Sequence, residues 1–432
     1  MRFATGLFIF IILVTSAIAQ LPTDIPNSLT VEQAIGLALS RNQDVVAAVK
    51  VVEKAKATVG EARSAAFPQV NFEADATHVK DINKAYSGES VNSEQYSISA
   101  TLSQPVSTFG RVSNALRGAK LYVQLAESKL ELTKQLITFQ LTKSFYDVLL
   151  AQELVKVNQE ALEIAVSHER NAQLRFEQGV GSEFEMLRAQ VRVANLQPGL
   201  IVAKDNLILA KQNFNTLLNI APEQPIEIIG KLEYTDYLPN SDTAWQIAQL
   251  HRSDLRIFNQ SKQIAEVQLN YYKAGYRPNL YLVSSFSDQL VKYSETPDDW
   301  VDSWYSGLSL QLPLFDGFKT AAQINNAKAG LGQAQAAYNK GLLSAQVEVK
   351  QTCLRIKESR AIVASVEEAV KLADRALEMA KISFENGRAT TLDVADAQLA
   401  LTTAKTNYAQ SVHDYQVALA KLKLDTGTTT LP

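Results

Sequence analysis

The sequence predicts an α+β membrane protein in which one unit of helix, strand, strand, long helix and helix is used twice. Three observations predict this fold class. The two halves of the 432-residue chain resemble each other at a nearly constant offset. Each half holds a run of about 65 residues with the apolar spacing of a coiled coil. Four shorter segments alternate between polar and apolar residues, as membrane-facing β-strands do.

The N-terminus carries the pattern of an export signal over residues 1–19. Arg2 precedes the apolar run Leu7–Val14, and the small residues Ala17 and Ala19 suit signal peptidase. This run is shorter than the ~20 residues that span a bilayer, which argues against a membrane anchor. No run of 18 or more apolar residues follows downstream. Any membrane-spanning part is therefore expected to consist of β-strands.

An internal repeat divides the mature chain into residues 20–239 and 240–432. Asp44 aligns with Asp254 at an offset of 210 residues, and the offset becomes 208 after the strands, where Ala119 aligns with Ala327. A change of only two residues over such a distance indicates one structural unit used twice.

Four segments alternate with a period of two: residues 68–79, 94–105, 278–290 and 302–313. In the first, Phe72 and Ala74 oppose Glu73 and Asp75. A soluble sandwich shows the same alternation and stays an alternative. Aromatic residues near the strand ends are typical of a membrane interface: Tyr96, Tyr281, Trp300, Trp304 and Tyr305. Four strands cannot close a barrel, because the smallest natural barrels have ~8, so several chains are needed. The loops 80–93 and 289–302 are expected to face the cell exterior.

Each repeat then predicts a very long helix and a return helix: residues 111–177 and 182–219 in the first, 319–385 and 390–425 in the second. From Ile324 to Phe384 the seam residues are spaced by alternating steps of three and four, as in a coiled coil. At ~1.5 Å per residue, such a helix is on the order of 100 Å long. Pro198 is expected to interrupt and bend the first return helix, because an interior proline costs ~3 kcal/mol or kinks the helix.

The composition argues against several function classes. With 42 Lys and Arg against 45 Asp and Glu, the net charge is −3, so no basic surface for nucleic acid is expected. One cysteine, Cys353, and four scattered histidines cannot form a disulfide framework or a closed zinc site. The chain carries no catalytic or nucleotide-binding motif. We therefore expect neither an enzyme, nor a cofactor, nor a bound metal.

These features together resemble the TolC-type outer-membrane efflux proteins, also called outer membrane factors. The resemblance covers residues 29–427 and depends on the duplicated unit, on Pro105 and Pro313 at strand ends, and on the tip motifs RFEQGVGSEFEMLRAQ and SFENGRATTLDVADAQ. It implies a homotrimer with a twelve-stranded β-barrel in the outer-membrane lipid of a Gram-negative bacterium, continuous with a periplasmic α-helical barrel. It also implies a periplasmic adaptor (membrane fusion protein) and an inner-membrane transporter as partners.

The resemblance implies the exit duct of a tripartite efflux or type I secretion system. Two alternatives remain. A structural periplasmic coiled-coil or adhesin-type protein without transport would share the long helices but would not require amphipathic strands. An all-helical exported enzyme would need a convergent polar pocket. The substrate and the class of pump are not encoded in the sequence, since drugs, metals and secreted proteins all use such ducts.

The candidate site lies at the turns that end the long helices. Asp393 and Asp396 are three residues apart and share one helix face. On spacing alone, they are ordinary acidic residues near a helix N-terminus, where they favour the helix dipole. The resemblance implies instead that they ring the periplasmic entrance of the pore, with Glu185 at the position of Asp393 in the first tip.

The resemblance also implies a latch in which a tyrosine and an arginine of the second tip hold an acidic residue of the first. Here Phe384 stands at the tyrosine position and Ala389 at the arginine position, so Arg388 and Glu185 are the substitute pair. The tips, which the resemblance implies contact the adaptor, are Gly179, Val180, Gly181 and Ser182 in the first repeat and Gly387, Arg388, Ala389 and Thr390 in the second. These residue types also suit helix C-caps and N-caps without any partner.

Overall fold

The structure is a computed structural model that describes residues 28–81, 91–292 and 300–431. The expected signal segment, residues 1–19, lies outside the described residues, as do the central parts of the two expected exterior loops, residues 82–90 and 293–299. Among the described residues, none of the helices is both long enough and apolar enough to cross a membrane.

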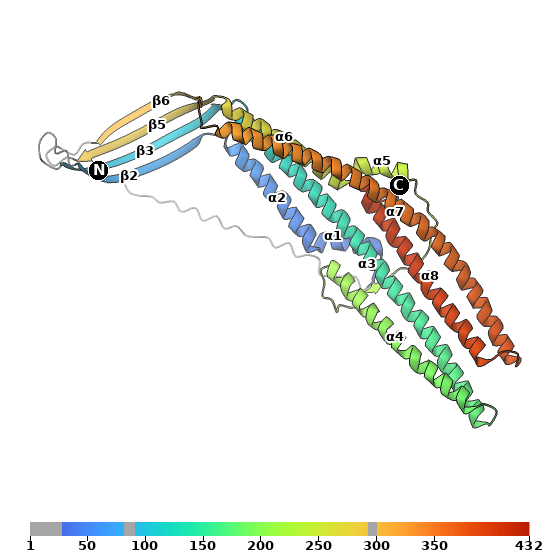
Figure 1. The fold of residues 1–432 in the computed structure, drawn as a ribbon. Helices are drawn as coiled ribbons and strands as arrows, with labels where there is room; N and C mark the ends of the chain where they lie inside the picture. Colours follow the sequence, from blue (N-terminus) through green and yellow to red (C-terminus); the bar gives the residue numbers. More distant parts are fainter. Residues whose placement is uncertain (1–27, 82–90, 293–299, 432) are drawn as a thin grey trace.

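The chain is built from two repeats with the same order of elements (Figure 1). The first repeat contains β1 (Ser28–Leu29), α1 (Val31–Arg41), α2 (Gln43–Ser64), β2 (Gln69–Asp81), β3 (Val91–Ser107), α3 (Arg111–Glu177) and α4 (Glu183–Leu217). The second contains β4 (Glu227–Ile228), α5 (Ser241–His251), α6 (Ser253–Lys273), the short 3-10 helix η1 (Ala274–Tyr276), β5 (Asn279–Lys292), β6 (Trp300–Gln311), α7 (Lys319–Glu385) and α8 (Thr391–Thr426). The fold class expected from the sequence is confirmed.

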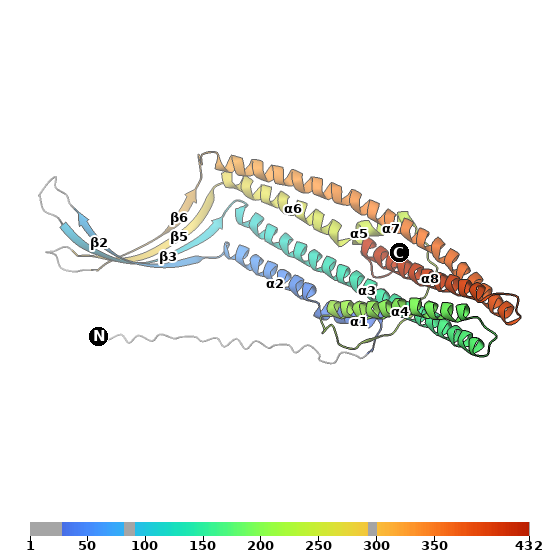
Figure 2. The ribbon, with the colours of Figure 1, turned by 60° about the horizontal axis from the view of Figure 1, so that its bottom comes forward.

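The molecule is elongated, with a sheet at one end and two helical hairpins at the other (Figures 1 and 2). The sheet is antiparallel with strand order β2-β3-β5-β6, so β2 and β6 are its edges. Helices α2, α3, α6 and α7 contact one another in that order and continue the strand order away from the sheet (Figure 2). Farther on, α4 packs on α3, α8 packs on α7, and α3 contacts α8.

The sheet has two chemically different faces. Phe72, Ala100, Phe286 and Trp304 are register partners across the four strands and form a row on the apolar face. The side chains of Phe72 and Trp304 are 71% and 76% exposed in the single chain, which suits a face turned to lipid.

The opposite face is polar. Its next row consists of Glu73, Ser99, Ser287 and Ser303. The hydroxyl oxygens of Ser287 and Ser303 lie 2.8 Å apart, so the two serines pair across β5 and β6. Polar pairs also occur on the apolar face: Asp288 opposes Asp302 near the outer ends of these strands, and Ser284 opposes Ser306 closer to the helices.

Two equivalent hydrophobic cores hold the middle of the molecule together. In the first repeat Leu141 and Phe145 of α3 are buried with Phe214 of α4. In the second, Val349 and Ile356 of α7 are buried with Tyr415 of α8. The Tyr415 hydroxyl also donates to the Thr235 carbonyl oxygen at 2.9 Å. These cores pack the short helices α1 and α5 and the segment between the repeats against the long helices, and β1 pairs with β4 beside the first core.

α4 runs through Pro198 as one continuous helix, so the sequence break at this proline does not divide the return helix. The bend expected there stays a prediction. A proline removes one backbone donor, but the rest of the helix keeps its hydrogen bonds and its packing. Gly199 directly follows, and a side chain there would approach the Asn158 side chain on α3 to 3.2 Å. Gly199 therefore allows α4 to pack closely on α3 beside the proline.

Candidate functional site

Each hairpin ends in a tight turn at the end of the molecule farthest from the sheet (Figure 1). Gly179 and Gly387 have φ of 74° and 72°, a left-handed conformation that favours glycine at a helix C-terminus. Ser182 then caps α4 by accepting a hydrogen bond from the Glu185 amide at 3.2 Å. The turns therefore reverse the chain with local hydrogen bonds alone.

The Asp393 side chain is hydrogen-bonded at the N-terminus of α8. One of its carboxylate oxygens accepts hydrogen bonds from the amide of Thr390 at 2.7 Å and from its hydroxyl at 2.8 Å, and the Asp393 amide donates back to the Thr390 hydroxyl. This capping box satisfies backbone donors at the helix start. The bonds from the Thr390 backbone and side chain hold the pKa of Asp393 below its usual range. Its carboxylate is therefore charged, exposed and fixed at the tip.

The two hairpins are joined beside Asp396 by Arg192, a residue that the sequence analysis missed. Arg192 of α4 donates from Nη2 to the backbone oxygen of Ala395 in α8 at 2.6 Å. Burial lowers the pKa of Arg192 and the charge of Arg188 lowers it further, while the negative charge of Asp396 acts in the opposite direction. The negative charge of Asp396 is thus partly compensated from within the same chain. In the sequence, Arg192 is marked only by its spacing of four residues from Arg188, which places both arginines on one helix face.

Glu185 and Arg388, the expected substitute latch pair, make no salt bridge with each other in the described single chain, and both are exposed. Phe384 makes a different contact. Its ring lies under the Arg175 guanidinium, 6.0 Å from the centroid, and packs against the small core of Leu377, Val394 and Leu401. Phe384 therefore links the tips of α3 and α7 by a cation–π contact.

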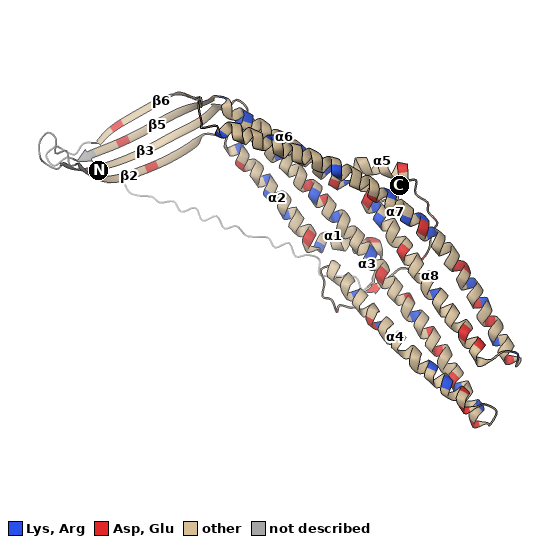
Figure 3. Cartoon of the chain, in the orientation of Figure 1, with Lys and Arg blue, Asp and Glu red and all other residues tan. Residues whose placement is uncertain are grey.

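Basic groups gather between the hairpins behind the acidic tips. His168 of α3 is half-buried, and its pKa is lowered by burial and then by the charges of Lys381 and Arg192. His168 is therefore neutral at physiological pH. Figure 3 shows that charged residues of both signs are dense along the helices, whereas charged residues are sparse on the strands.

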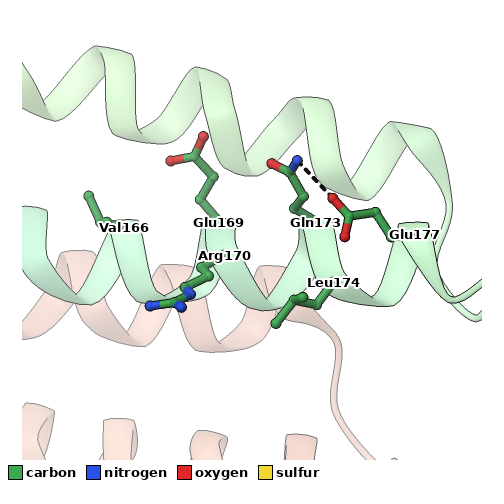
Figure 4. Close-up of a pocket in the computed structure, with 6 residues that line it drawn as sticks. All are labelled: Val166, Glu169, Arg170, Gln173, Leu174 and Glu177. Atoms are coloured by element: carbon green, nitrogen blue, oxygen red, sulfur yellow. Dashed lines mark hydrogen bonds between the residues drawn. The ribbon is translucent and has the colours of Figure 1, made fainter.

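A shallow groove runs along α3 near the first tip (Figure 4). It has a volume of about 310 Å³ and is lined by Val166, Glu169, Arg170, Gln173, Leu174 and Glu177. Gln173 donates to Glu177 at 3.0 Å within this stripe. All six residues belong to one helix, so the groove is an open helix face rather than a convergent polar pocket.

Comparison with known proteins identifies the family. The family model described as "Outer membrane efflux protein" matches residues 34–219 and 244–428, one match for each repeat. The chain belongs to this family. The resemblance to TolC-type proteins is confirmed, and the protein is an outer-membrane efflux channel of a Gram-negative bacterium that extends into the periplasm.

Individual relatives match over most of their length. The cobalt-zinc-cadmium resistance protein CzcC of Cupriavidus metallidurans is 26% identical over 91% of this chain and 89% of that protein. The outer membrane protein TolC of Vibrio cholerae is 22% identical over 86% of this chain and 84% of its own. The crystal structure of the outer membrane protein VceC of Vibrio cholerae superposes with a TM-score of 0.79 at 18% identity, covering 92% of this chain and 96% of that one.

Proposed function

We propose that three copies of this chain form the exit duct of a tripartite export system, which receives substrates from an inner-membrane transporter through a periplasmic adaptor. The main support is the combination of a four-stranded sheet with two open edges and two 67-residue helices, α3 and α7, that leave the sheet with α6 between them (Figure 2). Four strands are too few to close a barrel. Three copies supply twelve strands, and the helices that follow continue the duct by about 100 Å.

The hairpin tips form the periplasmic entrance in this proposal. Asp393 and Asp396 place negative charge at the second tip, and Glu185 places it at the first. Repeated in each copy, these carboxylates make the entrance selective for cations. The turns Gly179–Ser182 and Gly387–Thr390 are the exposed ends of the molecule, and we assign contact with the adaptor to them.

The transported substrate does not follow from the relatives, because their names include resistance to cobalt, zinc and cadmium and secretion of an alkaline protease. We assign the choice of substrate to the inner-membrane transporter. The duct itself supplies a polar inner sheet face, an acidic entrance and a passage across the outer membrane.

Purified protein in planar bilayers tests the proposal. Particles with the mass of three chains, which conduct ions after insertion, are the expected result. A structural coiled-coil or adhesin-type protein would give no conductance, and a stable single-chain particle would contradict the proposed assembly.

A further inference from the structure

The two repeats make equivalent turns where the strands pass into the long helices. In the first junction turn, Thr108–Gly110, Phe109 and Gly110 both have positive φ, 45° and 106°. In the second, Asp316–Phe318, Gly317 and Phe318 have φ of 65° and 66°. Each turn is capped in the same way, by the Thr108 hydroxyl accepting from the Val112 amide at 3.0 Å and the Asp316 carboxylate accepting from the Thr320 amide at 2.9 Å.

Inside the chain, the first junction turn is covered by the end of α6. Arg277 donates from Nη1 to the Phe109 carbonyl oxygen at 2.9 Å. Directly after this turn, Arg111 of α3 donates from Nε to the Tyr271 hydroxyl at 3.2 Å, and its guanidinium lies 5.4 Å from the centre of that ring. Contact between α3 and α6 is therefore how the first repeat joins the second at the rim of the sheet.

The second junction turn lacks such a cover within the described chain, because α7 and β6 lie at the edge of the helix layer and of the sheet. Leu314, Phe315 and Phe318 are 91%, 75% and 74% exposed. The rings of Phe315 and Phe318 meet edge to face at 5.4 Å. A hollow of about 200 Å³ between Tyr276 and this turn is lined mainly by apolar side chains. Such an apolar cluster on one edge marks a surface that a partner covers.

We propose that this cluster is covered by the end of α2 from a second copy of the chain, placed against α7 as α6 is placed against α3. The repeat offsets fix which residues meet. Glu61 of the partner subunit takes the place of Tyr271 and faces Lys319, which takes the place of Arg111. Phe67 of the partner subunit takes the place of Arg277 and packs on the second junction turn. This inference rests on the proposed assembly of several copies and specifies the contact between them.

The residues that replace Tyr271 and Arg277 at the equivalent positions of the first repeat suit the proposed contact. Glu61 and Lys319 carry opposite charges. Neither belongs to a salt bridge between described residues, although the charge of Lys319 also helps to lower the pKa of Asp316 in its own chain. Phe67 is 50% exposed, with the Arg63 guanidinium 5.4 Å from the centre of its ring. Inside the chain, Arg277 bonds the Phe109 carbonyl oxygen. At the contact between chains, Phe67 stands at the equivalent position and packs against the aromatic side chains Phe315 and Phe318. The partner edge, α2 and β2, is the other free edge of the same layer and sheet.

Cross-linking tests the contact. The single cysteine, buried Cys353, is first replaced by Cys353→Ser. Glu61→Cys and Lys319→Cys are then combined, and the detergent-solubilised protein is treated with a short bis-maleimide and run on a denaturing gel. Most chains are expected in dimer and trimer bands. The equivalent pair Arg111→Cys with Tyr271→Cys is the matched control and should cross-link within one chain, giving monomer bands only.

Glu61→Cys combined with Leu250→Cys, a position on α5 that is 74% exposed, should also give monomer bands. Monomer bands from Glu61→Cys with Lys319→Cys, in particles that still have the mass of three chains, would overturn this contact and leave the proposed function standing. Single-chain particles without conductance would overturn the proposed function itself. As a second measurement, Glu61→Lys and Lys319→Glu should each lower the temperature at which the oligomer dissociates, and the double exchange should restore it.

Discussion

His413 Nε2 lies 2.8 Å from an Asp147 carboxylate oxygen and joins α8 of the second repeat to α3 of the first. The other ring nitrogen lies 2.9 Å from Asp414, and the His413 side chain is only 8% exposed. Lys143 contacts the second oxygen of Asp147 at 2.9 Å. Burial alone would lower the pKa of His413, but the hydrogen bonds and charges of Asp147 and Asp414 raise it.

This contact makes the stability of the protein depend on pH. Because the pKa of His413 is raised on folding, the protonated imidazole stabilises the folded protein. This stabilisation is complete below the pKa of the unfolded state, about 6.5, and is lost as pH rises through the higher pKa of the folded state. Burial alone would raise the pKa of Asp147, but hydrogen bonds and charges from His413 and Lys143 lower it overall. The stability that the Asp147 carboxylate contributes is therefore lost as pH falls below about 4. His413→Gln should cost about 1.5 to 3 kcal/mol at pH 5.5, as for hydrogen bonds to charged groups, and less at pH 8.5.

The heat-dissociation temperature of the purified oligomer, measured from pH 5 to pH 9, checks this expectation. His251→Gln is the matched control, since His251 is exposed at the end of α5. A loss from His413→Gln that is equal at both ends of the range would show that the imidazole acts through packing alone.

The register of the sheet predicts which positions tolerate charge. Ala100→Lys places an ammonium between Phe72 and Phe286 on the apolar face, where lipid-facing Lys costs ~2 to 4 kcal/mol at mid-bilayer. Ser99→Lys, the matched control, lies on the polar face and should be mild. Ile98→Lys should be intermediate because its register partner is Asp288. Heat-modifiable migration of outer-membrane fractions measures assembly, and equal loss from Ala100→Lys and Ser99→Lys would contradict the assignment of the two faces.

The sequence predicted the parts of this structure that depend on local pattern and on repetition. The seam steps from Ile324 to Phe384 predict α7, and the internal repeat extends that prediction to α3. The strand faces follow from period-two alternation around Phe72 and Glu73. Contacts between repeats were not predicted. Arg192 reaching Ala395, Arg175 over Phe384 and His413 on Asp147 each join positions far apart in the chain, and their geometry follows from how the hairpins pack.

The entrance charge gives a prediction for conduction. Asp393→Asn with Asp396→Asn should weaken block by di- and trivalent cations added on the periplasmic side and should reduce cation preference. Asparagine oxygen still accepts from Thr390, so the cap of α8 and oligomer assembly should persist. Because the pKa of Asp393 is lowered, the share of cation preference that Asp393 contributes in the parent should be lost only below about pH 4. Glu169→Gln, in the groove on α3, is the control and should leave the block unchanged.

Removing the positive charge of Arg192 should have the opposite effect and strengthen the block by multivalent cations. The negative charge of Asp396 is close enough to raise the pKa of Arg192. Arg192→Gln therefore removes a positive charge near the Asp396 carboxylate in every copy of the chain. A unit charge in contact contributes about 1 kcal/mol in water, or about fivefold. Arg192 and Asp396 interact electrostatically without a salt bridge between these described residues, so block by trivalent cations in planar bilayers should tighten by less than about fivefold. Arg170→Gln removes the same charge from the groove of Figure 4 and should leave the block near its parent value. If Asp396 carries the effect, Arg192→Gln should change nothing in an Asp396→Asn background. An equally tighter block in that background would assign the effect of Arg192 to its bond with Ala395, and hence to the packing of α4 against α8.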